Sequence, residues 1–414
     1  MSEWKLKKLS ELGKFSRGKS KHRPRNDKSL FINGIYPLVQ TGEIKNSNLY
    51  VIRNNDYYNE FGLSQSKLWP EGTLCITIAA NIAETAILAY PMCFPDSIVG
   101  FNSYPNESSE LFVYYIFEFI KKEIQKTSSG SIQDNINIDY LTNLQLMVPS
   151  KAYQDKIVEL LSSLDQKIAL NNQINEELEA MAKTLYDYWF VQFDFPDENG
   201  KPYKSSGGKM VYNEQLKREI PEGWGVDSLW NIATFYNGLA MQKFRPASET
   251  AESLPVIKIR EMFSGFSKDT EKASIDIPKE AIVESGDILF SWSATLEVIF
   301  WGGEKGALNQ HIFKVTSEKY PKSFIYNELR SYLKVFKTIA ELRKTTMGHI
   351  TQDHLKQAMI IVPPSDLIDE IDNRISLILK QQLDLKQQNQ ELTQLRDWLL
   401  PMLMNGQVRV EQGE

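Results

Sequence analysis

The chain has 414 residues, which is long enough for two or more domains with hydrophobic cores of their own. No apolar run could span a bilayer, and the first residues, MSEWKLKK, are not a signal peptide, so we expect a cytoplasmic protein without membrane contact. The two cysteines, Cys75 and Cys93, exclude a disulfide framework and a zinc ribbon. The formal charge of −6 argues against indiscriminate coating of nucleic acid but leaves room for a local basic groove.

Residues 1–149 open with the spacing W-x4-L-x5-F-x2-G, which recurs 220 positions later. The repeated residues are Trp4, Leu9, Phe15 and Gly18, which match Trp224, Leu229, Phe235 and Gly238. Within this first segment, Leu74–Ala80 is predicted to be a strand and Glu110–Lys126 an amphipathic helix. We therefore expect a mixed α/β domain over residues 1–149.

A strongly basic loop lies near the start of this domain, at residues 17–28. It carries six basic residues against the single acidic Asp27, a net charge of +5. The basic residues are Arg17, Lys19, Lys21, Arg23, Arg25 and Lys28, and their counterparts in the second copy are Lys243 and Arg245, with Lys258 and Arg260 close behind. Such a loop suits contact with phosphates, the sequence-blind part of DNA affinity, although a solvated surface loop is the alternative.

Residues 150–192 are predicted to form one long amphipathic helix without Gly or Pro. Its apolar residues recur at spacings of three, four or their sums, as in a coiled-coil seam. They are Leu161, Leu164, Ile168, Leu178, Met181 and Leu185, with Asn171 and Asn175 on the same seam. A polar residue buried there costs stability but fixes the register of the helix against a partner.

The remaining segments repeat this order of domain and helix. Residues 193–222 are rich in Gly, Pro, Ser and Lys and are interpreted as a linker with at most one short helical turn. A second domain is expected over residues 223–363, with a strand at Asp287–Trp292 and a helix at Ser323–Lys344. A second long helix follows at 364–407, and a tail at 408–414.

The two long helices are copies of one sequence pattern. A shift of 214 residues places Ile157 on Ile371, Leu161 on Ile375, Leu164 on Ile378 and Asn175 on Asn389. The domain frameworks repeat as well, but their middle parts hardly match. Because the period is too long for a solenoid, we interpret the chain as a duplicated two-part unit whose two domains share a fold and recognise different things.

Motifs for catalysis are not found. There is no dinucleotide-binding G-x-G-x-x-G, and Gly207–Met210 lacks the residues of a phosphate loop. Val362–Ser365 is not the catalytic loop of a DNA amino-methyltransferase, and the four histidines, His22, His311, His349 and His354, do not show metal-ligand spacing. We therefore predict no catalytic residue, metal or cofactor in this chain.

Binding residues are better represented than catalytic ones. Short Thr/Ser-Gly loops at 127–133 and 345–352 present side chains that bond phosphates or base edges, and they also suit ordinary turns. The candidate DNA-contacting residues outside the basic loop and its counterpart are Gln40, Thr41, Lys45, Ser129, Ser131, Gln133, Thr346, His349 and Gln352. Tyr186, Tyr188, Trp189 and Trp398, on the outward faces of the helices, are candidates for partner contact, with hydrophobic core as the alternative.

These features together resemble the specificity subunit of type I restriction-modification systems over essentially the whole chain. Further residues that carry the resemblance surround the helices and the linker. They are Leu146–Pro149 and Ile360–Pro363, Trp189–Val191, Phe193–Phe195 and Ile220–Trp224, and the tail from Leu399–Pro401 to Leu403–Gly406. The variable middles match no known specificity, so recognition residues are not carried over.

The resemblance implies an α+β fold of two target recognition domains that alternate with two spacer helices. The helices would pack as an antiparallel coiled coil and relate the two copies by a pseudo-twofold. Each domain would read one half of a bipartite, asymmetric site in double-stranded DNA. The helices would hold two methyltransferase (modification) subunits, which use S-adenosylmethionine for adenine methylation. A restriction (translocase-nuclease) subunit with ATP and Mg could join the complex.

Two other readings stay open at the level of sequence. One is a coiled-coil scaffold whose flanking domains bind protein rather than DNA. The other is an enzyme with a site that the sequence does not reveal. Sharp salt dependence of binding to one duplex would separate the first reading from DNA recognition, and activity of the purified chain alone would support the second.

Overall fold

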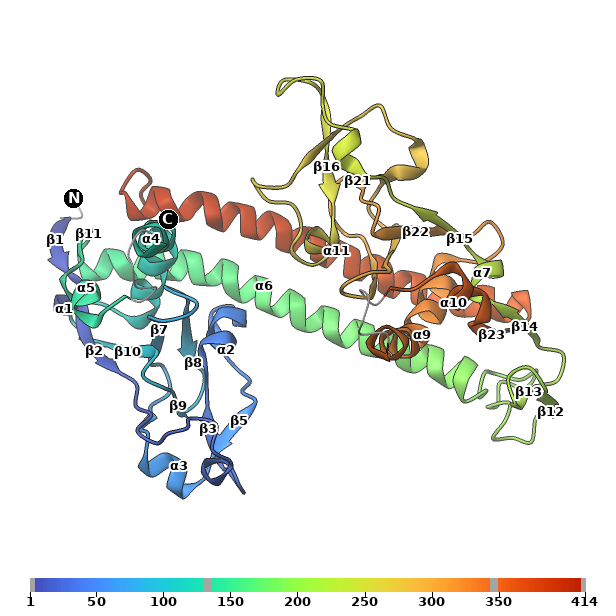
Figure 1. Ribbon diagram of the computed structural model, residues 1–414, viewed down its shortest axis with the longest axis horizontal. Coiled ribbons are helices and arrows are strands. Elements are labelled where there is room, and N and C mark those ends of the chain that lie inside the picture. The colour runs from blue at the N-terminus through green and yellow to red at the C-terminus, as the bar shows by residue number, and fades with distance from the viewer. Residues whose placement is uncertain (1–3, 130–135, 343–348, 411–414) are drawn as a thin grey trace. The chain divides into compact units, whose positions relative to one another are not determined.

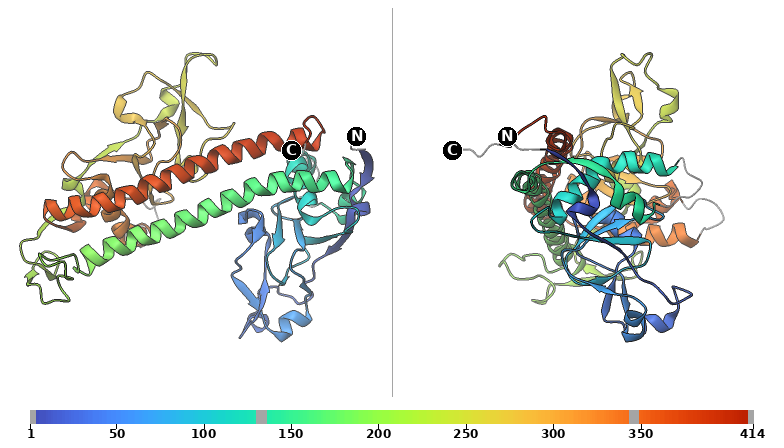
Figure 2. Two further views of the ribbon diagram at one scale, coloured as in Figure 1. Left: turned by 180° about the vertical axis from the view of Figure 1, so that it is seen from behind. Right: turned by 90° about the vertical axis from the view of Figure 1, so that its left-hand side faces the viewer.

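The computed structural model describes residues 4–129, 136–342 and 349–410. The chain divides into two compact units, unit 1 at 1–168 and 392–414 and unit 2 at 169–391. Each unit holds one mixed α/β domain and part of two long helices, α6 (Lys151–Tyr186) and α11 (Ser365–Met404), which Figures 1 and 2 show as continuous ribbons. The structure thus confirms the predicted alternation of two mixed domains with two long helices.

The domain of unit 1 is built on a five-stranded sheet, β2-β10-β7-β8-β4, and a four-stranded sheet, β5-β3-β9-β6, with β1 paired to β11. The strands are β1 (Lys5–Lys8), β2 (Gly13–Arg17), β3 (Tyr36–Leu38), β4 (Tyr50–Val51), β5 (Asp56–Tyr58), β6 (Leu68–Trp69), β7 (Leu74–Thr77), β8 (Thr85–Leu88), β9 (Met92–Cys93), β10 (Ile98–Ser103) and β11 (Gln145–Val148). The helices are α1 (Leu9–Leu12), η1 (Lys28–Leu30), α2 (Thr41–Asn46), α3 (Glu60–Ser64), α4 (Glu110–Ser129) and α5 (Ile138–Asn143).

The domain of unit 2 has a sheet in the order β15-β22-β19-β20, a second sheet in the order β17-β16-β21-β18, and the pair β14-β23. The strands are β12 (Met210–Asn213), β13 (Arg218–Pro221), β14 (Gly225–Ser228), β15 (Thr234–Asn237), β16 (Ser253–Ile257), β17 (Lys272–Ser274), β18 (Ile282–Val283), β19 (Ile288–Ser291), β20 (Glu297–Phe300), β21 (Gly306–Leu308), β22 (Ile312–Thr316) and β23 (Met359–Val362). The helices are η2 (Asp187–Val191), α7 (Leu229–Ile232), η3 (Met241–Lys243), α8 (Ile259–Ser264), η4 (Lys279–Ala281), α9 (Lys322–Leu342) and α10 (Gln352–Gln357).

The two domains share one topology except for β4, which pairs with β8 and adds a fifth strand to the larger sheet of unit 1. β10 is antiparallel to both of its neighbours β2 and β7, and β22 is antiparallel to both β15 and β19. In the smaller sheets β3 pairs parallel with β9, as β16 does with β21. The order of the helices is also the same in both domains, because α4 follows β10 and α9 follows the corresponding strand β22. The duplication predicted from the sequence therefore includes the sheets as well as the long helices.

Each long helix buries its first turns in the domain that precedes it. Ile157 and Leu161 of α6 are fully buried in the core of unit 1, together with aromatic residues of α4. Ile371 and Ile375 of α11, at the matching positions, are fully buried in unit 2. Each of these side chains contributes on the order of 2 kcal/mol through burial. Of the helices in the described ranges, none has the length and apolar character that crossing a bilayer requires.

The last residues of α11 complete the core of unit 1. Leu403 is fully buried there. The hydroxyl of Tyr153 donates to the carbonyl of Val408 at 3.3 Å and accepts from the amide of Val410 at 3.2 Å. Unit 1 is therefore closed by residues that lie more than 200 positions after its domain.

The two long helices pair antiparallel within each unit through a seam that is partly polar. In unit 1, Arg396 bonds Asp165 at 2.8 Å. In unit 2, the fully buried Asn171 donates to Asn389 at 2.9 Å, and Gln382 donates to the carbonyl of Asn175 at 3.1 Å. The antiparallel coiled coil is thereby confirmed, with the predicted asparagines on its seam.

Two predictions about this region are wrong in detail. Met181, which the periodicity placed on the seam, has 59% of its surface exposed. Within residues 193–222, where we expected a linker with one short helical turn, Met210–Pro221 form the β12–β13 hairpin. Phe195 explains the second error, because its ring lies 5.0 Å from Trp224 and 4.6 Å from Tyr203, so that the segment packs into the core of unit 2.

The end of α6 also differs from its predicted role. We expected Tyr186 and Trp189 on an outward face, but each is only 2% exposed. α6 passes into the π-helical turn η2 here, and Tyr186 packs with Phe190 and Phe324. Its hydroxyl donates to Glu328 of α9 at 2.5 Å. These two residues therefore belong to the core of unit 2, because its aromatic cluster encloses them.

The buried amide of Asn171 generates a first prediction. Its side-chain oxygen has no hydrogen-bond partner among the described residues, and Leu385 stands at the matching position of the second copy. We expect Asn171→Leu to raise the free energy of unfolding by about 1 kcal/mol, because it removes an incompletely paired buried amide. The urea midpoint of the full chain measures this change. Asn171→Ala, which leaves a cavity, should lower the midpoint, and a lower midpoint for the leucine variant would contradict the expectation.

The carboxyl of Glu328 generates a second prediction. Burial raises its pKa to about 7, against the lowering effects of the Tyr186 hydroxyl and Arg218. The folded state therefore holds a proton that the unfolded state releases near pH 4.5, and this contribution to stability is lost as the pH rises through about 7. Glu328→Gln keeps the group neutral, so at pH 8 it should exceed the wild type in unfolding free energy by on the order of 1 to 2 kcal/mol.

The check is urea unfolding of both proteins from pH 5 to pH 8. The gap between them should widen over this range, while Glu280→Gln, a change of an exposed carboxyl in the same unit, should give a constant gap. Parallel profiles for wild type and Glu328→Gln would refute the assignment.

Candidate nucleic-acid interface

The basic loop that follows β2 is fixed to the domain of unit 1 by its backbone. Gly18 donates to the carbonyl of Ile98 at 2.8 Å, and Lys21 donates to that of Gln65 at 3.1 Å. The chain passes so close to its neighbour that a Cβ at Gly18 would lie 2.2 Å from the carbonyl oxygen of Pro95. Gly238 makes the same close approach in unit 2, 2.2 Å from the carbonyl oxygen of Asn309. This contact explains why the repeated opening motif ends in glycine.

Acidic side chains offset part of the charge of this loop. Asp96 forms ion pairs with Arg25 at 2.5 Å and Arg23 at 3.7 Å, and its carbonyl accepts from Arg17 at 2.6 Å. Asp27 lies 2.9 Å from His22, and the pKa of Asp27 is lowered to about 2, first by the amide of Ser29 and then by His22. The three arginines are therefore oriented by Asp96 and are not freely solvated.

The lysines of the loop remain available to an anionic partner. Lys19, Lys21 and Lys28 are exposed, and within the described residues none of them forms an ion pair. In unit 2, Lys243 at the end of η3 and the exposed Arg245 are likewise without an ion pair in the described ranges. These exposed side chains carry the charge that phosphate contact needs.

The short helices α2 and α8 occupy equivalent places and have equivalent N-caps. Gln40 precedes α2, and its backbone N–H donates to the carboxylate of Glu43 at 2.8 Å. Lys258 precedes α8, and its backbone N–H donates to the carboxylate of Glu261 at 3.2 Å. The two cap side chains each bond an acid from the neighbouring strand region, Gln40 to Asp56 at 3.1 Å and Lys258 to Glu271 at 2.6 Å. This framework is repeated, whereas the cap residue itself differs between the copies.

The other predicted residues of these helices are also held in place. Thr41 begins α2 and is half-buried, and Lys45 on the same helix donates to the side chain of Asn81 at 3.2 Å. Arg260 on α8 bonds the buried carboxylate of Glu261 at 2.6 Å. Lys45 and Arg260 are exposed, so that both bonded side chains still face solvent.

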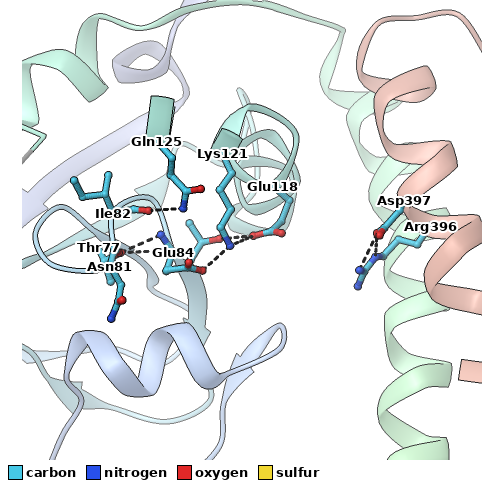
Figure 3. A network of polar contacts seen from close by, with 10 residues as sticks. Thr77, Asn81, Ile82, Glu84, Glu118, Lys121, Gln125, Arg396 and Asp397 are labelled. Atoms are coloured by element: carbon cyan, nitrogen blue, oxygen red, sulfur yellow. Dashed lines mark hydrogen bonds and ion pairs between the residues drawn. The ribbon is translucent and has the colours of Figure 1, made fainter. Parts of the chain in front are cut away.

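The loop between β7 and β8 is anchored by a network that Figure 3 shows. The hydroxyl of Thr77 donates to the carbonyl of Asn81 and accepts from the amide of Glu84. The carboxylate of Glu84 forms an ion pair with Lys121 of α4 at 2.5 Å, and Gln125 donates to the carbonyl of Ile82 at 3.0 Å. The loop is therefore tied at both of its ends and to the helix beside it.

Unit 2 repeats this network with different residues. Ser291 takes the place of Thr77, since its hydroxyl donates to the carbonyl of Thr295 at 2.6 Å and accepts from the amide of Glu297 at 2.9 Å. Glu297 forms an ion pair with Lys337 of α9 at 3.2 Å. The hydroxyl, the glutamate and the helix lysine thus recur, while the residues at the loop tips do not.

The Thr/Ser-Gly loops are only partly described. Ser131, Gln133 and Thr346 lie outside the described residues, and Ser129 ends α4 with a side chain that is not described. His349 is exposed and pairs its backbone with Ser293. Gln352 is exposed as the first residue of α10.

Residues that the sequence reasoning missed surround Trp292, next to His349. The indole of Trp292 donates to Asn237 at 2.9 Å, and its ring lies 5.7 Å from that of His311. Gln310 lies 3.5 Å from His311. Asn237 directly precedes the repeated glycine Gly238. This position is the one feature of the sequence that points to the residues around Trp292.

Of the four residues predicted to contact a partner, two lie on the surface. Tyr188 is 37% exposed and Trp398 is 55% exposed. The exposed apolar side chains on the long helices also include Leu170, Leu377 and Leu395. Among the described residues, no group of three His, Cys, Asp or Glu side chains is placed to hold a metal ion.

Known proteins share this architecture and this sequence pattern. The MjaIX type I restriction enzyme specificity subunit of Methanocaldococcus jannaschii is 24% identical over 427 residues, covering 99% of this chain and 94% of that protein. The HindI type I restriction enzyme specificity subunit of Haemophilus influenzae is 25% identical over 357 residues, covering 73% of this chain and 75% of that protein.

A solved structure shares the fold of this chain. The S subunit of a type I restriction-modification system from M. genitalium aligns with a TM-score of 0.57 at 16% identity, covering 100% of this chain and 97% of that one, which shows a shared fold. The family model described as type I restriction modification DNA specificity domain matches residues 1–180 and 221–394. These two stretches correspond to the two copies of the repeat, and the chain belongs to the family of type I restriction-modification specificity subunits.

Proposed function

We propose that the chain is the non-catalytic, DNA-recognising subunit of a type I restriction-modification complex and reads a bipartite, asymmetric site in double-stranded DNA. One observation carries the proposal. The two domains keep the same anchoring framework but present different side chains from it, as Gln40 and Lys258 do at equivalent helix caps. A duplicated reader with two different surfaces suits a site whose two halves differ.

The charge distribution supports the same function. The chain is acidic overall, and each long helix segment, 150–190 and 365–405, carries four basic and seven acidic residues. The exposed lysines of the basic loop lie on a domain and not on these acidic helices, and they form a local cationic surface there. Contact between such lysines and phosphates supplies affinity without sequence preference, and base contacts elsewhere on the domain supply specificity.

We assign the target recognition domains to residues 1–149 and 223–363 and the spacer helices to 150–192 and 364–407. Residues 193–222 connect the copies and residues 408–414 form the tail. In this proposal Ser129, Ser131, Gln133 and Thr346 remain candidate DNA contacts.

We also propose that two methyltransferase subunits dock on the long helices. The exposed Tyr188 and Trp398, with Leu377 and Leu395, offer apolar side chains where a partner helix or loop could pack. S-adenosylmethionine would be held by those partners, and ATP with Mg by a restriction subunit where one joins. The assembly would act on DNA in the cytoplasm.

The decisive experiment compares cells that express this chain together with its cognate methyltransferase subunit and cells without this chain. We expect genome-wide mapping of methylated adenines to show a two-part motif with a fixed gap, which disappears when the chain is deleted. A stable complex without any motif would favour a scaffold role. Failure to form a complex would refute the assignment.

A further prediction concerns the basic loop. Lys21→Ala/Lys28→Ala should weaken DNA binding of the complex about equally for all sequences and reduce the slope of log affinity against log salt by about 2, because each lost phosphate contact removes about 0.9 from the slope. Titration of a duplex at several salt concentrations measures the slope. Lys201→Ala/Lys204→Ala removes two exposed lysines elsewhere and should leave it unchanged. An unchanged slope in the loop variant would exclude these lysines from the interface.

A further inference from the structure

We propose that a cluster of four side chains in unit 2, Asn237, Trp292, Gln310 and His311, reads bases in one half of the DNA site. The inference rests on the proposed function and deepens it, since it names residues that determine specificity. The four equivalent residues of unit 1, Arg17, Ile78, Asp96 and Ser97, would read the other half.

The cluster in unit 2 lies where three strands of one sheet begin or end. Asn237 ends β15, Trp292 follows β19, and Gln310 and His311 precede β22. Asn237 and His311 are exposed, while Trp292 and Gln310 are half-buried. The indole nitrogen of Trp292 donates to the side-chain oxygen of Asn237 at 2.9 Å, and within the described residues the side-chain nitrogen of Asn237 makes no hydrogen bond.

This combination of side chains has the chemistry of base recognition. Asn and Gln amides match the donor and acceptor of adenine in the major groove, and histidine bonds base acceptors or donors. The ring of Trp292 lies 5.7 Å from the ring of His311 and 6.2 Å from that of His349, and it adds a flat apolar surface to the polar groups.

Backbone hydrogen bonds establish which residues of unit 1 are equivalent. Gly238 donates to Ile312 at 3.0 Å, as Gly18 does to Ile98 at 2.8 Å. The amide of Trp292 donates to His311 at 3.3 Å, as that of Ile78 does to Ser97 at 2.9 Å. The amide of Ile350 donates to Trp292 at 2.9 Å, as that of Ile136 does to Ile78 at 3.0 Å. The same backbone therefore carries two different sets of side chains.

The set in unit 1 has different chemistry. Arg17 is exposed at the end of β2, and its Nε donates to the carbonyl of Asp96 at 2.6 Å. The carboxylate of Asp96 orients Arg25 beside it at 2.5 Å. A guanidinium favours the two acceptors of guanine, whereas a carboxylate accepts from cytosine. The two equivalent places are thus suited to different base pairs.

The adjacent loops share an uncommon backbone conformation at equivalent positions. Ala80 and Ala294 both stand three residues after the anchoring hydroxyl, and both have a left-handed backbone, with φ of 65° and 56°. Alanine adopts this conformation only where the surroundings impose it, and such strain collects at binding sites. A backbone fixed in this way would suit base recognition, because bidentate contacts to a base tolerate little displacement.

The test exchanges the side chains between the copies. In the full chain, co-expressed with the methyltransferase subunit, Asn237→Arg/Gln310→Asp/His311→Ser places three of the four residues of unit 1 on the equivalent backbone of unit 2 and keeps Trp292. We expect mapping of methylated adenines to show altered bases in one half of the motif, with the other half and the gap unchanged. Tyr212→Ala, which removes a 59% exposed aromatic residue elsewhere in unit 2, should leave the whole motif unchanged.

A single substitution protects the test against misfolding of the triple variant. Asn237→Ala removes one exposed side chain, and duplexes that carry each single base change should reveal a loss of discrimination of about 10- to 100-fold at positions in that same half. An unchanged motif together with unchanged discrimination overturns the inference. A wild-type complex with no site preference overturns the proposed function, and the inference with it.

Discussion

Burial of the first turns of each long helix in its own domain is the constraint on which the rest of the structure depends. Ile157 and Leu161, and at the matching positions Ile371 and Ile375, have no exposed surface. A helix of this length would otherwise be free to rotate about its axis, and the packed turns fix which face meets the other helix. In each unit that face pairs antiparallel, through Asp165 with Arg396 in one and Asn171 with Asn389 in the other.

The domains separate the residues that hold the framework from the residues that vary. Hydroxyls at Thr77 and Ser291, glutamates at Glu84 and Glu297, and glycines at Gly18 and Gly238 perform the same task in both copies. Each of them is buried, bonded to backbone or paired with a lysine of the neighbouring helix, so a change in one of them would move a loop. The exposed side chains between these framework residues do not hold the loops in place. Two surfaces with different chemistry therefore sit on one fold at little cost to stability.

Much of this fold was predictable because long amphipathic helices and internal repeats leave local signals. The periodicity around Leu161 and the 214-residue shift identified both helices and their polar seam, and the repeated Trp-Leu-Phe-Gly spacing located both domains. Tyr186 and Trp189 were misjudged because helical periodicity does not reveal that α9 and the hairpin cover the end of α6.

The candidate site was predicted less well, for a physical reason. The basic loop is contiguous, so its charge is visible in the sequence, but Asp96 neutralises part of it from a distance of about 70 positions. The cluster around Trp292 draws on residues near 237, 292 and 310, and the turns that unite them form only when β15, β19 and β22 align. No local sequence pattern shows that these residues lie close together, whereas comparison of the two folded copies does.

The discontinuity of unit 1 has a consequence for the order in which the protein is made. Unit 2 is one uninterrupted stretch of chain, but unit 1 needs Leu403 in its core and the contacts of Tyr153 with Val408 and Val410. During synthesis the amino-terminal domain therefore waits, with part of its core uncovered, until nearly the whole chain has left the ribosome. The first domain made is the last one completed, and its closure is a contact of very high sequence separation, the kind that forms slowly.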